Sequence, residues 1–165
     1  MFTGKYFVEK LNMKEHPEGG YYNECLKSKD IIDAKAVDSS FDGNRKLWTS
    51  IYFLLKDRDV SRFHRLKSDE IWYFHSGVPM VIHIINKNGE LERVKLGLDI
   101  ERGEQPQVLI PKGSIFGAIM DGTGYSLAGC MVSPGFEFGD FELLEREDLI
   151  RKYPQHELII KRLTK

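Results

Sequence analysis

Turn-forming residues recur at short intervals through most of this 165-residue chain, and this spacing constrains its fold more than any other feature. Between residues 47 and 132 they separate short runs of aromatic and β-branched residues, which favour strands. Each of these turns contains glycine, and they lie at 76–77, 87–89, 111–113 and 121–124. Two of them hold the Asn-Gly or Asp-Gly pairs typical of tight hairpins. Strands without intervening helices predict an all-β protein, either a double-sheet jelly roll or a small barrel.

The predicted strands lie at 21–28, 47–55, 61–66, 70–75, 79–86, 91–96, 106–110, 114–120 and 125–132. A polar excursion at 29–45 interrupts them. Residues 3–13 predict a short amphipathic helix capped by Thr3, and residues 145–165 predict a C-terminal helical segment. Because 165 residues suit one domain of ordinary size, we expect a single domain over 1–165.

Charge and cysteine content narrow the expected partners and location. Lys and Arg number 24 and Asp and Glu number 25, so the formal net charge of −1 creates no overall field that attracts nucleic acid or an anionic membrane. No stretch approaches the roughly 20 apolar residues that span a bilayer. Cys25 and Cys130 lie far apart without CxxC spacing, which fits a reducing compartment. We therefore expect a cytoplasmic protein without nucleic-acid or membrane partners.

The run HRLKSDEIWYFHSG, at 64–77, concentrates the candidate chemistry. It fits a metal site, a metal-free acid–base site, or a strand-turn-strand with a polar edge. Alternation along a strand places Glu70 on the same face as Trp72 and Phe74. A carboxylate between two large aromatic side chains is desolvated, which raises its pKa and suits a general acid. The alternative is an edge residue whose carboxylate binds backbone amides or an arginine.

Four motifs in order resemble the cupin superfamily, and in particular its fifth catalogued domain family, a family of unknown function sometimes described as predicted epimerases. They are HPEGGYYNE, FHRLKSDEIWYF, QVLIPKG and PGFEFGDFEL, and the resemblance extends over about residues 8–144. The spacing of His64, Glu70 and Gly77 is similar to that of the first cupin motif. The resemblance implies a cupin-type double-stranded β-helix, or jelly roll.

Metal-binding cupins hold their ion with three histidines and one glutamate, and this sequence departs from that set. Leu66 and Phe116 stand where two of the histidines would be, so only His64 and Glu70 remain. Two protein ligands are too few for a transition metal that ordinarily takes three or four. We therefore expect no metal and no other cofactor, and a metal-dependent cupin enzyme is the less favoured alternative.

Without a metal, the nearest functional analogue implied by the resemblance is the cupin-fold epimerase of deoxysugar nucleotides. By that resemblance His64 is the candidate catalytic base, and Glu70 or Asp69 would orient it and raise its basicity. Glu70 is also the candidate acid, whereas the structural alternative for His64 is a hydrogen-bonded core residue. The side chains expected to shape the substrate pocket are Glu18 near its mouth, Tyr52 as a further candidate acid, Trp72 and Gln107.

Two hypotheses for function follow. The first is a metal-independent epimerase or isomerase acting on a sugar-like or other polar carbonyl compound inside the barrel. The second is a non-catalytic cupin that binds a small molecule in the same pocket, as a sensor or storage protein. Exposed strand edges also need covering, so we expect a homodimer.

Overall fold

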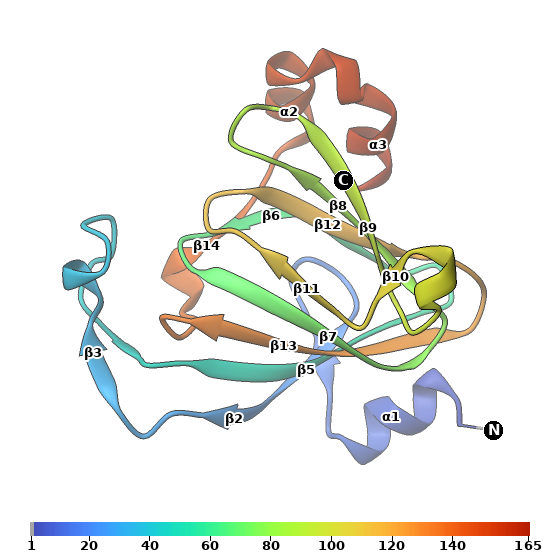
Figure 1. Ribbon diagram of the computed structural model, residues 1–165, viewed down its shortest axis with the longest axis horizontal. Coiled ribbons are helices and arrows are strands. Elements are labelled where there is room, and N and C mark those ends of the chain that lie inside the picture. Colours follow the sequence, from blue (N-terminus) through green and yellow to red (C-terminus); the bar gives the residue numbers. More distant parts are fainter. Residues whose placement is uncertain (1) are drawn as a thin grey trace.

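Two six-stranded sheets form the body of this protein in the computed structural model, which describes residues 2–165. The strand order is β1-β2-β5-β13-β7-β11 in the first sheet and β10-β9-β8-β12-β6-β14 in the second. Every pairing within these sheets is antiparallel except that of β9 with β10. The sheets form two layers (Figure 1), which confirms the prediction of an all-β cupin-type jelly roll. Met1, the first residue of the predicted domain, lies outside the described residues.

The strands of the first sheet are β1 (Lys14–Glu15), β2 (Tyr21–Lys27), β5 (Thr49–Lys56), β7 (Asp69–Gly77), β11 (Gln107–Ile110) and β13 (Tyr125–Ser133). Those of the second are β6 (Val60–Leu66), β8 (Met80–Ile85), β9 (Leu91–Leu96), β10 (Glu104–Gln105), β12 (Ile115–Met120) and β14 (Phe141–Leu143). All nine predicted strands form. The three additional strands of these sheets, β1, β10 and β14, have two or three residues each. Strands this short are too short to be detected from an alternation of apolar and polar residues.

Alternation along each strand divides the apolar side chains between the core and the outer faces. In β5, Phe53 and Leu55 point into the core between the sheets, whereas Leu54 packs on the outer face with Met13 and Leu127. The core between the sheets also contains Trp72, and it lies next to the cavity described below.

Helices cover the outer faces of both sheets (Figure 1). The N-terminal helix α1 (Gly4–Lys10) is shorter than predicted, and Thr3 caps it by accepting a hydrogen bond from the backbone N–H of Tyr6 at 3.2 Å. At the other end of the chain, α2 (Arg146–Lys152) and α3 (Glu157–Arg162) pack against the second sheet through Leu149 and Ile160. No helix in residues 2–165 is long and apolar enough to cross a membrane, and the cellular compartment stays a prediction.

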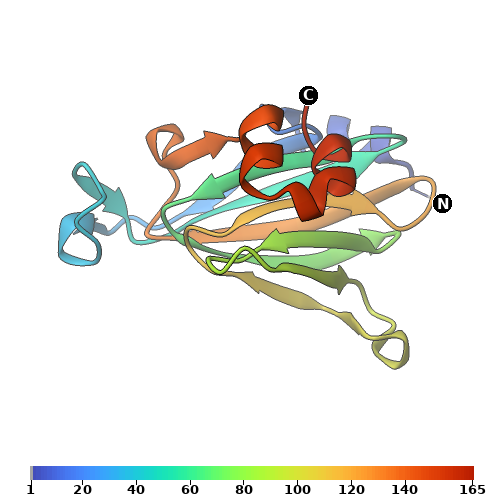
Figure 2. The ribbon, with the colours of Figure 1, turned by 90° about the horizontal axis from the view of Figure 1, so that it is seen from above.

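The polar excursion at 29–45 contains structure of its own. It forms β3 (Ile31–Asp33), the short 3-10 helix η1 (Ala34–Ala36) and β4 (Asn44–Lys46), which together project from one end of the sheets (Figures 1 and 2). A buried ion pair ties this arm to η3 (Phe138–Asp140), because Arg45 donates to Asp140 from Nε at 2.6 Å and from Nη2 at 2.9 Å. This pair joins the arm to the segment that closes one side of the cavity.

Candidate functional site

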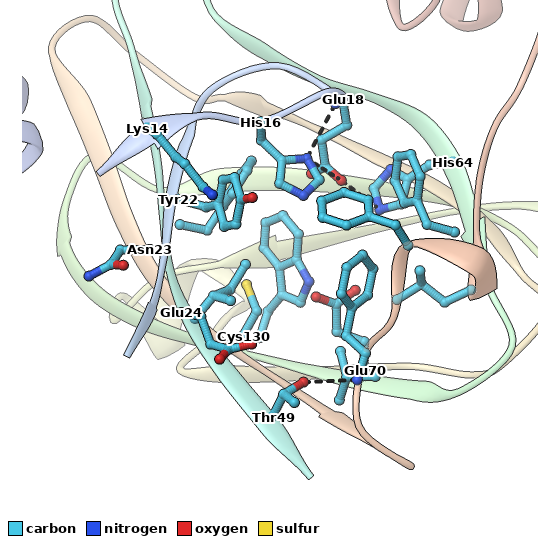
Figure 3. A pocket seen from close by; sticks show the side chains of 18 residues that line it. Lys14, His16, Glu18, Tyr22, Asn23, Glu24, Thr49, His64, Glu70 and Cys130 are labelled. Atoms are coloured by element: carbon cyan, nitrogen blue, oxygen red, sulfur yellow. Dashed lines mark hydrogen bonds and ion pairs between the residues drawn. The ribbon is translucent and has the colours of Figure 1, made fainter. Parts of the chain in front are cut away.

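A cavity of about 310 Å³ lies between the two sheets and is bordered on one side by residues of the 134–143 segment (Figure 3). Most of its wall is aromatic or aliphatic, contributed by Phe53 and Trp72 from the core and by Phe136, Phe138 and Phe141. Small-molecule pockets usually measure about 300–1,000 Å³, so this cavity suits a compound of the size of a single sugar. The polar groups that line it include His16, Glu18, His64, Glu70 and Cys130.

Glu18 reaches the cavity from the loop between β1 and β2. Gly19 has a φ of +109°, and a Cβ atom there would lie 2.2 Å from the carbonyl oxygen of Val60, so only glycine lets the loop approach β6 so closely. The Arg62 backbone N–H donates to the Glu18 carbonyl at 2.8 Å, and the Ser61 hydroxyl donates to the Glu18 carboxyl at 2.7 Å. Glu18 lines the cavity, as expected from the sequence, and its side chain is buried in the cavity wall at 5% exposure.

The hydrogen bonds of His64 define which of its nitrogens carries a proton. Nδ1 lies 2.7 Å from the carbonyl oxygen of Arg62, and a carbonyl only accepts, so Nδ1 is the donor. Burial lowers the pKa of His64 to about 3, so the ring is neutral at pH 7 and Nε2 is an acceptor. Nε2 lies 3.1 Å from Oε2 of Glu18. Burial, together with the nearby Glu70 carboxyl, raises the pKa of Glu18 well above its usual value, which favours the protonated carboxyl as the donor to His64.

The residue that orients the His64 imidazole differs from the one expected. Glu18, and not Glu70 or Asp69, contacts the imidazole. Asp69 is exposed and accepts a hydrogen bond from the Lys112 backbone N–H at 2.8 Å. The pKa of His64 is lowered rather than raised, because burial outweighs the hydrogen bond to the Arg62 carbonyl.

His16 also lines the cavity, although it was not among the residues predicted for the site. Its side chain is 6% exposed, and its Nδ1 accepts a hydrogen bond from the backbone N–H of Glu18 at 3.3 Å. Burial lowers the pKa of His16 to about 4. The ring packs edge-on against Tyr22 at a centroid distance of 4.6 Å. The signal available in the sequence was the proximity of His16 to Glu18 in the HPEGG loop.

Glu70 is the second buried carboxyl of the cavity. It is 6% exposed, and its Oε2 has no hydrogen-bond partner among the described residues. Burial raises the pKa of Glu70 to about 8, although the Trp72 indole and the Cys130 thiol favour the ionised form. Trp72 Nε1 also lacks a partner within residues 2–165. The structure therefore confirms the predicted desolvation of Glu70 beside Trp72, while Phe74 does not line the cavity.

The comparison with known families agrees with this fold. The model of the cupin superfamily family DUF985 matches residues 5–144. The chain belongs to this cupin family. It is similar to protein SO0799 from Shewanella oneidensis, whose crystal structure superposes with a TM-score of 0.91 at 47% identity over 100% of this chain and 99% of that one. It is also similar to the uncharacterized protein YML079W of Saccharomyces cerevisiae, at 27% identity over 155 aligned residues, and the match covers 87% of this chain and 76% of the yeast protein.

A more distant likeness concerns the fold alone. Oxalate decarboxylase from Bacillus subtilis superposes on 98% of this chain with a TM-score of 0.56 at 15% identity, and the match covers 38% of the decarboxylase. The shared architecture is the cupin sheet sandwich, so the chemistry of this cupin has to be argued from its own residues.

Two residues expected to shape the pocket of this cupin lie elsewhere. Ile51 and Phe53 line the cavity from β5, so alternation places Tyr52 between them on the outer face, where it packs with the α1 side of the sheet. Gln107 is exposed at the start of β11, the edge strand of the first sheet, and pairs with Tyr73. Neither side chain lines the cavity.

The donor set of this cupin does not fit a metal ion. Leu66 and Phe116 are buried at the two positions where metal-binding cupins carry histidines, and the Phe116 ring lies 4.0 Å from that of His64 between centroids. In residues 2–165, no three His, Cys, Asp or Glu side chains are grouped as metal ligands. Hydrocarbon side chains cannot ligate, so the four cupin ligand positions supply a transition metal with only His64 and Glu70.

Proposed function

We propose that this cupin is a metal-independent isomerase or epimerase, which transfers protons at a carbon atom next to a carbonyl group in a small, sugar-like or other polar carbonyl compound. The observation that carries the proposal is the Glu70 carboxyl. It is buried at the cavity wall, Oε2 has no hydrogen-bond partner within the described chain, and its pKa is raised to about 8.

A general acid or base works best when its pKa lies near the operating pH. At pH 7 a carboxyl with a pKa of about 8 is ionised in about one molecule in ten, so both forms take part in proton transfer. His64 is less suited to the role of base that the resemblance implies, because its pKa is about 3 and its Nε2 is occupied by the Glu18 carboxyl at 3.1 Å. In this proposal Glu70 transfers the proton, and the His64–Glu18 pair keeps the neighbouring wall rigid and uncharged.

The cavity also limits the substrate. At about 310 Å³ it suits a single sugar unit, and the nucleotide of a deoxysugar nucleotide would have to lie outside it. Among residues 2–165, Lys14 is the one lysine or arginine that lines the cavity, and it is exposed. A diphosphate would therefore meet few compensating positive charges there, which favours a substrate that lacks a diphosphate group.

The second candidate function is binding without turnover. It is favoured by the two histidines, whose lowered pKa values make them weak bases, and by the largely aromatic wall, which would hold a sugar-like ligand by stacking. In that case Glu70 would act as a hydrogen-bonding group for the ligand.

Solvent-proton exchange separates the two functions. The protein, treated with a chelator, is incubated in deuterated water with single aldoses, ketoses and 2-hydroxyketones, and deuterium at the carbon next to the carbonyl is followed by NMR. We expect exchange with at least one compound, and a loss of about 10²–10⁴-fold in Glu70→Gln, the range typical of general acid–base catalysis. Glu101→Gln, an exposed control, should exchange like the wild type. Binding without exchange would support the second function, and exchange unaffected by Glu70→Gln would contradict the first.

We also propose that this cupin forms a homodimer. The first sheet ends at β11, and Leu109 on this edge strand is 54% exposed. An edge strand with an exposed apolar side chain readily pairs with another chain. Light scattering should give the mass of two chains for the wild type and of one chain for Leu109→Lys; a monomeric wild type would contradict the proposal.

A further inference from the structure

The imidazole of His16 is fixed as a hydrogen-bond donor toward the cavity. Its Nδ1 accepts from the backbone N–H of Glu18 at 3.3 Å, and a backbone N–H only donates. The other neighbour of Nδ1 is Oε2 of Glu18, at 3.4 Å, and burial raises the pKa of this carboxyl. In a neutral ring the proton therefore lies on Nε2. Figure 3 shows the His16 ring extending into the cavity from the side of Glu18, with Glu70 across the view from it.

The groups around the inner cavity are donors, and they carry no positive charge. Trp72 Nε1 is a donor only and has no partner within residues 2–165. Glu70 is mostly protonated at neutral pH, and its Oε2 also lacks a partner there. A buried donor without an acceptor costs about 1–3 kcal/mol, so a ligand that brings oxygen acceptors relieves this deficit. The cavity thus matches an uncharged compound rich in carbonyl and hydroxyl oxygens.

We propose that His16 is a catalytic residue, which donates a hydrogen bond from Nε2–H to the substrate carbonyl oxygen while Glu70 takes the proton from the adjacent carbon, and that the substrate is an uncharged hydroxycarbonyl compound. This inference rests on the proposed function and names its second reacting group and its substrate class.

The step balances with the two side chains alone. The ionised Glu70 carboxylate takes the proton as the C–H bond breaks, the C–H electron pair forms a carbon–carbon double bond, and the carbonyl π pair moves to oxygen. The resulting enediolate oxygen accepts the hydrogen bond from His16 Nε2–H. Return of a proton from Glu70 to the same carbon restores the original configuration, and it gives exchange once the Glu70 proton has exchanged with solvent; epimerisation requires delivery of a proton to the opposite face. Return to the neighbouring carbon, with the hydroxyl proton passing between the two oxygens, gives isomerisation.

A neutral imidazole suits this role because it stabilises the oxyanion without first having to lose a charge. Enzymes that form enediolates use such a histidine, with its pKa lowered so that imidazole, not imidazolium, polarises the carbonyl. The burial of His16 meets this condition. An anionic substrate would instead place its charge beside ionised Glu70, and no lysine or arginine other than Lys14 lines the cavity to offset it.

The first test measures the tautomer of His16 directly. In protein labelled with ¹⁵N-histidine, long-range ¹H–¹⁵N spectra at pH 7 should show His16 as the neutral Nε2–H form, with assignment from His16→Gln. Addition of dihydroxyacetone, an uncharged hydroxycarbonyl probe, should shift this Nε2 signal. A proton on Nδ1, or a charged His16 ring at pH 7, overturns the proposal whatever the substrate is.

The second test measures function in matched variants. Deuterium exchange into dihydroxyacetone should fall about 10²–10³-fold in His16→Leu, as when one oxyanion donor is removed, and less in His16→Gln, whose amide N–H still donates. His75→Leu, the same change at an exposed position, should match the wild type. In both His16 variants the affinity for dihydroxyacetone should change less than the exchange rate, so kcat should fall more than KM changes.

The outcomes separate this inference from the function on which it rests. If exchange depends on Glu70 but is equal in His16→Leu and the wild type, the assignment of His16 is wrong and the proposed function stands. If the wild type shows neither exchange nor an Nε2 shift with dihydroxyacetone, the hydroxycarbonyl substrate class is wrong. Tighter binding of dihydroxyacetone phosphate than of dihydroxyacetone would overturn the preference for an uncharged substrate.

Discussion

The carboxyl oxygen Oε2 of Glu18 lies 3.1 Å from Nε2 of the His64 imidazole, and both groups are buried. On the opposite side of the ring Nδ1 donates to the Arg62 carbonyl at 2.7 Å, and burial lowers the pKa of His64 to about 3, so the neutral ring presents Nε2 to Glu18 as an acceptor. Burial thus favours the neutral forms of two groups that are usually charged in acid–base sites. The cavity wall gains hydrogen bonds without the large penalty of burying an ion pair.

This pairing predicts different results for two substitutions of Glu18. Glu18→Gln retains an N–H donor for His64 and an oxygen acceptor for Ser61, so the free energy of unfolding should change by less than about 1 kcal/mol. Glu18→Ala leaves the His64 nitrogen and the Ser61 hydroxyl buried without this partner and should lose about 2–4 kcal/mol. Urea unfolding at pH 7 measures both. Equal losses would mean that Glu18 is ionised in the folded protein.

The free energy of unfolding should fall as the pH rises above neutrality and also as the pH falls into the acid range. The pKa of Glu70 rises from 4.5 to about 8 on folding, so between these values the folded state binds more protons and loses stability as the pH rises. The pKa values of His16 and His64 fall from 6.5 to about 4 and about 3, so their contribution is lost as the pH falls below 6.5. Together with the raised pKa of Glu18, these shifts place the maximum of the free energy of unfolding near pH 5–6.

Unfolding of Glu70→Gln tests this expectation. Between pH 6.5 and 8, the free energy of unfolding should decline less steeply in the variant than in the wild type, by about 1.4 kcal/mol per pH unit. The reason is that unfolding of the variant no longer releases the proton of Glu70. Glu101→Gln, exposed in η2 (Ile100–Arg102), should keep the wild-type slope. Parallel pH profiles for Glu70→Gln and the wild type would place the Glu70 titration outside this window.

Restoring the missing histidines should create a metal site. In the double variant Leu66→His, Phe116→His, the two new imidazoles join His64 and Glu70 in the cupin ligand set, so we expect one Zn²⁺ or Mn²⁺ ion per chain by calorimetry and elemental analysis. The metal-free form should be about 2–4 kcal/mol less stable than the wild type, because a large core side chain is lost. The same variant with His64→Ala should bind at least tenfold more weakly. Stoichiometric metal in the wild type would contradict the assigned donor set.

The close approach of the Glu18 loop to β6 should make Gly19 sensitive to substitution. Gly19→Ala combines a φ of +109° with a contact of 2.2 Å to the Val60 carbonyl oxygen, so the loop must move and stability should fall by about 2 kcal/mol or more. Gly103→Ala is the control, because its φ is also positive, at +78°, but nothing lies within 4 Å of the added Cβ. It should lose about 1 kcal/mol. Equal losses in urea unfolding would show that the contact with β6 contributes little.

Local sequence signals predicted most of the framework because strands and tight turns depend on residues close together in the chain. The alternation of Phe53 with its neighbours and the glycines of the hairpins were enough to locate nine strands. The same signals missed β1 and β14, which form because longer strands beside them offer free backbone groups.

The sequence by itself determined the fold class, the loss of two cupin metal ligands at Leu66 and Phe116, and the association of Glu70 with Trp72. Only the tertiary structure decided which groups meet in the cavity. Glu18 contacts Ser61, which is 43 residues away, and alternation alone leaves open which face of β5 looks inward, so Tyr52 was misplaced. The neutral state of His16, His64 and the two carboxyls depends on burial by both sheets, because desolvation arises from the packing of distant segments around a group.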